Sequence, residues 1–142
     1  MTKYCTKGSY GDNWFTDNKK ELDPEDDAAY VNWGRDWRMP SKEEFKELIN
    51  SSYTTTEWTT QNGVKGRLIT SNSNGNSIFL PAAGCREDSS HYGTVVGHYW
   101  SRTLNSDSPH YAWSLSFNLS SIDTSNYDRY IGFSVRPVRF SE

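Results

Sequence analysis

An alternation of apolar and polar residues near the C-terminus constrains the fold of this chain most strongly. From Ala112 to Leu119, every second residue is large and apolar, and the residues between them are Ser or Asn. Successive side chains of a β-strand point to opposite faces. The pattern therefore predicts a strand with one apolar face (Trp113, Leu115, Phe117, Leu119) and one polar face (Ser114, Ser116, Asn118). His98–Ser101 and Gly132–Phe140 are predicted as neighbouring strands, with a bulge or an edge at Pro137.

A first helix is predicted upstream, with Asp23 as its N-cap and Pro24 at its first position. The acidic run 23–27 suits the positive end of the helix dipole, and Gly34 supplies the end. Trp33, like Trp37, Trp100 and Trp113, is expected to pack in the core.

A second helix is predicted directly after Pro40. Ser41 and Glu44 form a capping box, and apolar residues follow at helical spacing: Phe45, Leu48 and Ile49.

After these helices the signals change to strands. Thr54–Thr60 and Val64–Thr70 flank a tight-turn signal at Asn62-Gly63, and Ile78–Leu80 reads as a strand buried on both faces. Residues 84–97 are expected to form a loop. Two N-terminal helices followed by a mainly antiparallel, twisted sheet predict an α+β fold, with residues 1–142 forming a single domain.

Charge and hydropathy exclude some classes of partner. The net charge is −3, and no clustered basic face is evident, so we expect no nucleic-acid partner. No apolar run approaches the roughly 20 residues that span a bilayer, so we expect no membrane insertion by this domain. The first residues carry no signal-peptide pattern, and we expect the domain to be excised from a longer surface protein.

Metal and cofactor chemistry has little support in the residue pattern. The three histidines, His91, His98 and His110, match no compact ligand spacing, and the acidic run 23–27 lacks the spacing of a calcium loop. We expect no cofactor and no metal. Cys5 and Cys85 either pair or remain two inert thiols, the second being the default.

Several ordered sequence blocks resemble a known family, the Fibrobacter succinogenes major paralogous domain, common in Bacteroidetes surface proteins. The blocks cover residues 26–34, 37–41, 62–64, 77–84, 99–101 and 132–138. The resemblance implies a C-type-lectin-like fold. It also implies similarity to the variable proteins of diversity-generating retroelements, with residues 99–138 as the candidate variable binding region.

The same resemblance bears on two activities. Calcium-dependent lectins of this fold use Glu-Pro-Asn or Gln-Pro-Asp with Trp-Asn-Asp, and none of these triplets occurs here. Formylglycine-generating oxidases, which also resemble this fold, need paired cysteines in the C-terminal part. This chain has only Cys5 and Cys85, so we expect it not to be an enzyme.

The leading hypothesis is a recognition domain that displays a diversified surface, in a retroelement variable protein or an adhesin tip. Its ligand would be a protein or glycan on another cell or phage surface, with the domain extracellular, at the cell surface or on a phage particle. The alternative is a structural or assembly module of a surface or phage appendage, without a ligand of its own. Tyr, His, Ser, Asn and Asp are typical of adaptable binding loops. The candidate ligand-binding residues are His91, Tyr92, His98, Arg102, Asn105, Asp107, His110, Tyr111, Ser114, Ser116, Asn118, Asp123, Asn126, Tyr127, Asp128 and Tyr130.

Overall fold

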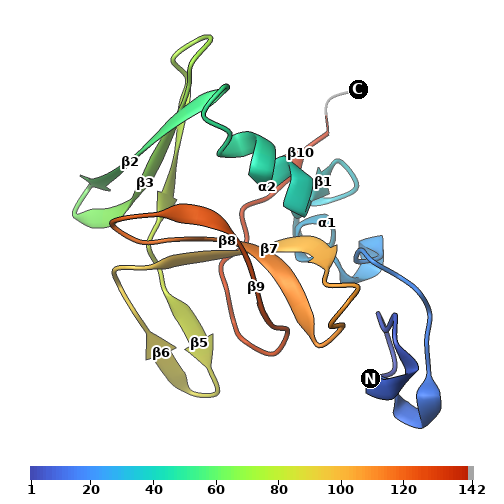
Figure 1. Cartoon of the computed structure of the whole chain (residues 1–142). Helices are drawn as coiled ribbons and strands as arrows, with labels where there is room; N and C mark the ends of the chain where they lie inside the picture. Colours follow the sequence, from blue (N-terminus) through green and yellow to red (C-terminus); the bar gives the residue numbers. More distant parts are fainter. Residues whose placement is uncertain (141–142) are drawn as a thin grey trace.

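The computed structural model describes residues 1–140, and it has the predicted α+β composition (Figure 1). The helical elements are three 3-10 turns, η1 (Gly8–Tyr10), η2 (Asp12–Trp14) and η3 (Pro24–Asp26), and two helices, α1 (Ala28–Trp33) and α2 (Lys42–Leu48). The strands are β1 (Trp37–Arg38), β2 (Thr54–Gln61), β3 (Val64–Ser71), β4 (Ser77–Pro81), β5 (Cys85–Glu87), β6 (Ser90–Tyr92), β7 (Gly97–Leu104), β8 (Tyr111–Phe117), β9 (Ile122–Asp128) and β10 (Val138–Arg139). No helix in this range is long and apolar enough to cross a membrane.

The strands form several small antiparallel sheets. Two sheets have three strands, β2–β3–β4 and β7–β8–β9, and two are pairs, β5–β6 and β1–β10. The β1–β10 pair returns the last described part of the chain to the first third, close to α2 (Figure 1). The predicted turn between β2 and β3 is confirmed, because Asn62 and Gly63 have φ of 50° and 79°, the left-handed pair that a two-residue hairpin needs.

Helix α1 begins later than the sequence predicts, because Asp27 rather than Asp23 is its N-cap. The Asp27 carboxylate is fully buried and accepts hydrogen bonds from the backbone N–H groups of Ala29 at 2.8 Å and Tyr30 at 3.2 Å. It also accepts one from Met39 N at 3.0 Å, so a single side chain joins the start of α1 to the segment before α2. Residues 24–26 form only the 3-10 turn η3.

The other end of α1 is where the sequence places it, at Gly34, whose φ is 97°. The expected core position of Trp33 is wrong. Its side chain is 54% exposed, because this six-residue helix buries only Ala29.

Helix α2 begins as predicted at Ser41, whose Oγ accepts a hydrogen bond from Glu44 N at 3.0 Å. Its apolar side covers one face of the β7–β8–β9 sheet and forms the main core. The buried members of this core are Phe45, Ile69, Leu80, Ala82, Tyr99, Leu115 and Phe117. Gly97 is required beside it, since a Cβ at this position would lie 2.1 Å from the Phe117 ring.

Three strand predictions need correction. Residues 85–92 form the β5–β6 hairpin instead of a loop. The third strand beside β8 is β9, a polar segment for which the sequence pattern predicts no strand, whereas only residues 138–139 of the predicted strand 132–140 form a regular strand. Strand β8 ends at Phe117, so Asn118 and Leu119 lie in the following turn and Leu119 is exposed. In β4, Leu80 is buried and Ile78 and Phe79 are only partly so.

Replacing Asp27 with Ala should lower the free energy of unfolding by about 3 kcal/mol, because three backbone N–H groups lose their acceptor in a buried place. Asp27→Asn should lose less, since the amide retains one acceptor oxygen. Glu25→Ala is the matched control, because this carboxylate is exposed. Urea unfolding followed by tryptophan fluorescence measures all three. A loss at Asp27→Ala no larger than in the control would contradict this role.

Candidate functional site

The two faces of the β7–β8–β9 sheet differ in what covers them. Helix α2 packs on the face that carries Tyr99 and Leu115. Because side chains alternate along a strand, the pairing register places His98, Trp100 and Tyr127 on the opposite face.

Four rings gather on this opposite face, which we call the aromatic face: His98, Trp100, Tyr127 and Phe133, all partly exposed. Phe133 lies at the centre of the group. Its ring stacks on Trp100 and His98 at centroid distances of 4.2 and 4.6 Å, and Tyr127 meets it edge-on at 5.3 Å. Offset stacks and edge contacts of this kind hold rings in fixed orientations. The result is an ordered apolar surface that is still accessible to solvent.

Phe133 is held there by backbone pairing with the free edge of β7. Trp100 N donates to Ser134 O at 3.0 Å, and Ser134 N donates to His98 O at 3.1 Å. The indole Nε1 of Trp100 adds a hydrogen bond to Ile131 O at 3.1 Å. Residues 131–134 therefore extend the sheet by one short edge segment.

Two serine side chains of β8 lie on the same face of the sheet, beneath the rings, and connect to His98. His98 Nδ1 is 2.8 Å from Ser116 Oγ, which is 3.2 Å from Ser114 Oγ, and Ser114 Oγ donates to Ser125 O at 3.1 Å. Ser114 is fully buried and lies beneath the aromatic face. It therefore cannot contact a ligand, although the sequence pattern places it among the candidate binding residues. The structure thus brings together His98, Ser116 and Tyr127 among the predicted residues.

A hollow of about 510 Å³ adjoins the aromatic face and shares Phe133 with it. It is lined by Ala83, Gly84, Cys85, Arg86, His91, Gly132, Phe133 and Ser134. The predicted residue His91 faces it, with Nε2 2.7 Å from Ala83 O. Tyr92, on the same β5–β6 hairpin, is exposed, as is Tyr130 in the loop after β9. The hairpin and this loop extend the surface around the rings.

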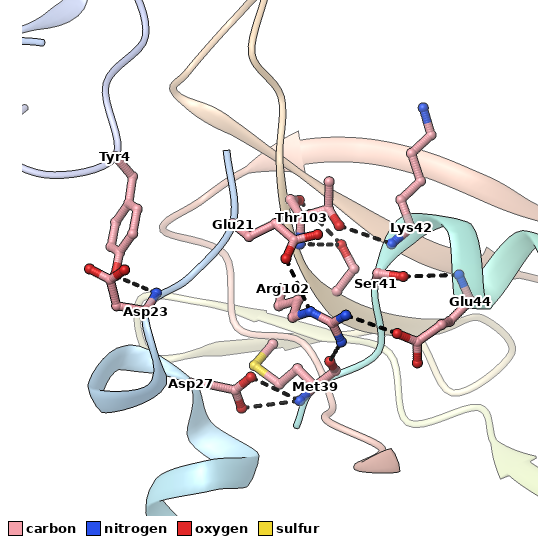
Figure 2. Close-up of polar contacts among 11 residues, drawn as sticks. Tyr4, Glu21, Asp23, Asp27, Met39, Ser41, Lys42, Glu44, Arg102 and Thr103 are labelled. Carbon is pink, nitrogen blue, oxygen red and sulfur yellow. Dashed lines mark hydrogen bonds and ion pairs between the residues drawn. The ribbon is translucent and has the colours of Figure 1, made fainter. Parts of the chain in front are cut away.

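Arg102 has a structural role that the sequence does not reveal. Its Nη2 pairs with Glu44 at 2.9 Å, its Nη1 donates to Met39 O at 2.8 Å and its Nε pairs with Glu21 at 3.3 Å (Figure 2). Figure 2 also shows Lys42 N donating to Thr103 Oγ1 at 3.0 Å, which joins the start of α2 to β7, next to the Ser41 cap. With all these partners, the Arg102 side chain joins β7 to α2 and to the N-terminal segment.

Several other predicted residues lie away from the aromatic face. Tyr111, Asn126 and Asp128 occupy the opposite side of the sheet, where Asn105 Nδ2 donates to Asn126 Oδ1 at 2.9 Å. His110 lies between Tyr10 and Tyr111, and its Nδ1 is buried without a hydrogen-bond partner among the described residues.

Three predicted residues are exposed in turns or near a strand end. Asn118 Oδ1 accepts from the backbone of the β8–β9 turn, and Asp107 lies in the loop that Asn105 organises. Asp123 is exposed at the register position opposite Ser116. Of these, Asp123 lies nearest to the aromatic face along the sheet.

The sequence gives no signal for a larger groove of about 850 Å³ between α2, the β2–β3–β4 sheet and the segment before β10. Most of its lining surface is apolar, and Arg136 is among its lining residues. The lining residues are Pro40, Glu44, Phe45, Glu47, Leu48, Ser52, Tyr53, Thr54, Ser71, Asn72, Ser73, Ile78, Leu80, Arg136, Pro137 and Val138. Only tertiary packing brings these segments together.

The acidic run and the thiols have local partners. The carboxylates of Asp23, Glu25 and Asp26 lie within 4.8 Å of one another, but Asp23 pairs with Lys19, and Asp26 with Lys3. Cys5 is buried, Cys85 is partly exposed, and both are free thiols.

Arg102→Ala should lower the free energy of unfolding by about 2 kcal/mol, because Glu44 and the Met39 carbonyl lose a largely buried donor. Arg139→Ala is the control. Its partner Asp36 is 3.8 Å away and both side chains are exposed, so the loss should stay below about 0.5 kcal/mol. Urea midpoints compare the two variants, and equal losses would contradict the structural role of Arg102.

Burial lowers the pKa of His98 below its ordinary value of 6.5. As the pH falls through 6.5, the unfolded chain takes up a proton at this residue before the folded chain does, so stability should fall. The free energy of unfolding, measured in urea between about pH 7.5 and pH 5.5, should therefore decline more steeply in the wild type than in His98→Gln. Identical slopes would show that His98 is not the group responsible.

Comparison with known proteins identifies a family to which the chain belongs, but no individual protein that matches it. No curated protein matches the chain, and no solved structure does either. A family model described as the Lcl C-terminal domain matches residues 12–139, which include both helices and all the described strands. This description differs from that of the family to which the sequence blocks pointed, although those blocks lie within the matched range. The chain therefore belongs to the Lcl C-terminal domain family.

Proposed function

We propose that this chain is a non-enzymatic recognition domain whose ligand contacts the aromatic face and the adjoining β5–β6 hairpin. The observation that carries the proposal is the aromatic face itself. Four rings remain partly exposed although their mutual packing fixes them in place. Ordered aromatic side chains give contact area at a low entropic cost, and the surrounding Ser and Asp residues offer hydrogen bonds.

The proposal extends to the fold family and the setting. The order of two helices followed by antiparallel sheets supports a C-type-lectin-like fold, and the sequence blocks support a relationship to the Fibrobacter succinogenes major paralogous domain. On this view the domain is part of a longer exported protein at the cell surface or on a phage particle. Its ligand is a protein or glycan on another surface.

A diversified surface would concern the aromatic face and the loops at its edge, as in retroelement variable proteins. Comparing this gene among isolates tests the idea. Substitutions should concentrate at exposed positions between 102 and 131, such as Asp123 and Tyr130, whereas the core positions Leu115 and Phe117 should stay constant. Uniform residues across 102–131 would remove diversification from the proposal.

The alternative, an assembly module without its own ligand, is favoured by a different observation. Part of the predicted binding set is used internally: Arg102 in its ion pairs, Asn105 with Asn126, and Ser114 under the sheet. The two functions differ in what surface substitutions do, because a module without a ligand has no binding to lose.

Binding to arrays of cell-surface proteins and glycans distinguishes the two. Any binding seen with the wild type should weaken about tenfold or more in the double variant Tyr127→Ala, Tyr130→Ala. Tyr53→Ala is the control, because this tyrosine is also exposed but borders the groove on the other side of α2. Circular dichroism checks that each variant is folded. Equal effects of the double variant and the control would contradict the proposed face.

A further inference from the structure

The hydroxyl chain beneath the aromatic face determines where the proton of His98 lies. The chain ends at Ser125 O, a carbonyl oxygen that can only accept. Ser114 must therefore donate to it, and the single hydroxyl proton of Ser114 is then used. For the Ser114–Ser116 contact to be a hydrogen bond, Ser116 has to donate to Ser114.

The same reasoning extends to the imidazole. Once Ser116 has donated its proton to Ser114, its oxygen can only accept from His98 Nδ1, at 2.8 Å. All three contacts are hydrogen bonds together in only one arrangement, with the proton of the neutral ring on Nδ1. The other ring nitrogen, Nε2, then carries a lone pair.

The position of Nε2 makes this lone pair available to a ligand. In residues 1–140 it has no hydrogen-bond partner, and it is not among the buried atoms. The ring that carries it is held by stacking on Phe133 at 4.6 Å and by the edge contact with Tyr127 at 5.2 Å. Ring packing and the serine chain thus fix both the orientation and the tautomer.

We infer that His98 is the hydrogen-bond acceptor of the aromatic face, and that its Nε2 receives a hydroxyl or amide N–H group of the ligand. This inference rests on the proposed recognition function and specifies the chemistry of the same surface. A carboxylate or another group without a proton would meet the Nε2 lone pair with its own lone pairs, so such groups are disfavoured there. Apolar rings on both sides favour a donor attached to a flat or apolar body.

The tautomer can be measured without any ligand. In a ¹⁵N-labelled sample at neutral pH, two-bond and three-bond proton–nitrogen correlations should show the His98 proton on Nδ1. Ser116→Ala removes the acceptor and should move the proton to Nε2, whereas Ser120→Ala, an exposed turn position, should leave it on Nδ1. A proton on Nε2 in the folded wild type would overturn the inference.

The preference for a donor is tested with phenol and anisole, which share a ring and differ in the O–H group. Phenol should shift the His98 ring signals and the backbone amides of Tyr127 and Phe133. It should bind about tenfold more tightly than anisole, because one hydrogen bond in a partly desolvated site changes the dissociation constant by about this factor. Ser116→Ala should remove this preference. Equal affinities, or no shift at His98 with either compound, would overturn the inference.

These results separate the inference from the proposed function. A wrong tautomer or an absent phenol preference removes the acceptor role of His98 alone, because array binding and isolate variation do not depend on it. The opposite outcome is also possible to distinguish. If the tautomer and the phenol preference are as expected, but the Tyr127→Ala, Tyr130→Ala variant binds the arrays as well as the wild type does, the proposed function is wrong.

Discussion

The arrangement of helix α2 on the β7–β8–β9 sheet depends on the ion pairs and hydrogen bonds of the Arg102 guanidinium. This side chain extends from β7 to Glu44 on α2, to the carbonyl of Met39 and to Glu21 in the N-terminal segment. The β7 backbone reinforces these contacts, since Arg102 N donates to Pro40 O and Leu22 N donates to Arg102 O. Helix α2 is thereby fixed on one face of the β7–β8–β9 sheet, and the four rings lie on the other face.

The sequence predicted correctly those helix ends and turns that depend on contacts between residues close together in the chain. The cap at Ser41 and the turn at Asn62-Gly63 depend on residues a few positions apart, and both are confirmed. The start of α1 at Asp27 is not predicted, because Asp23 and Asp27 are equally suitable caps by residue type. Two partners of Asp27, Ala29 N and Tyr30 N, are local, and only the third, Met39 N, is distant in sequence. Strand β9 was missed for a different reason. Its Ser, Asn and Asp residues favour turns by themselves, and pairing with β8 overrides that preference.

The sequence pattern predicted the types of residue at the candidate site. It did not predict which of these residues lie together in the folded protein. Alternation correctly separated Ser116 from Leu115, and it identified the sheet face that carries polar residues. It could not show that Phe133 would return to the edge of β7 and place its ring between His98 and Trp100. Nor could composition distinguish an Asn or Arg that faces a ligand from one that holds the fold together, because both uses need the same donors and acceptors.

The edge segment 131–134 and strand β10 have a consequence for the synthesis of the protein. Both are translated after their pairing partners, β7 and β1 respectively. Until then β1 lacks its strand partner, and the aromatic face lacks its central ring. Long-range pairings of this kind form late in folding. The aromatic face is therefore complete only once residues 131–134 have been translated, and a chain stalled before them lacks its central ring, Phe133.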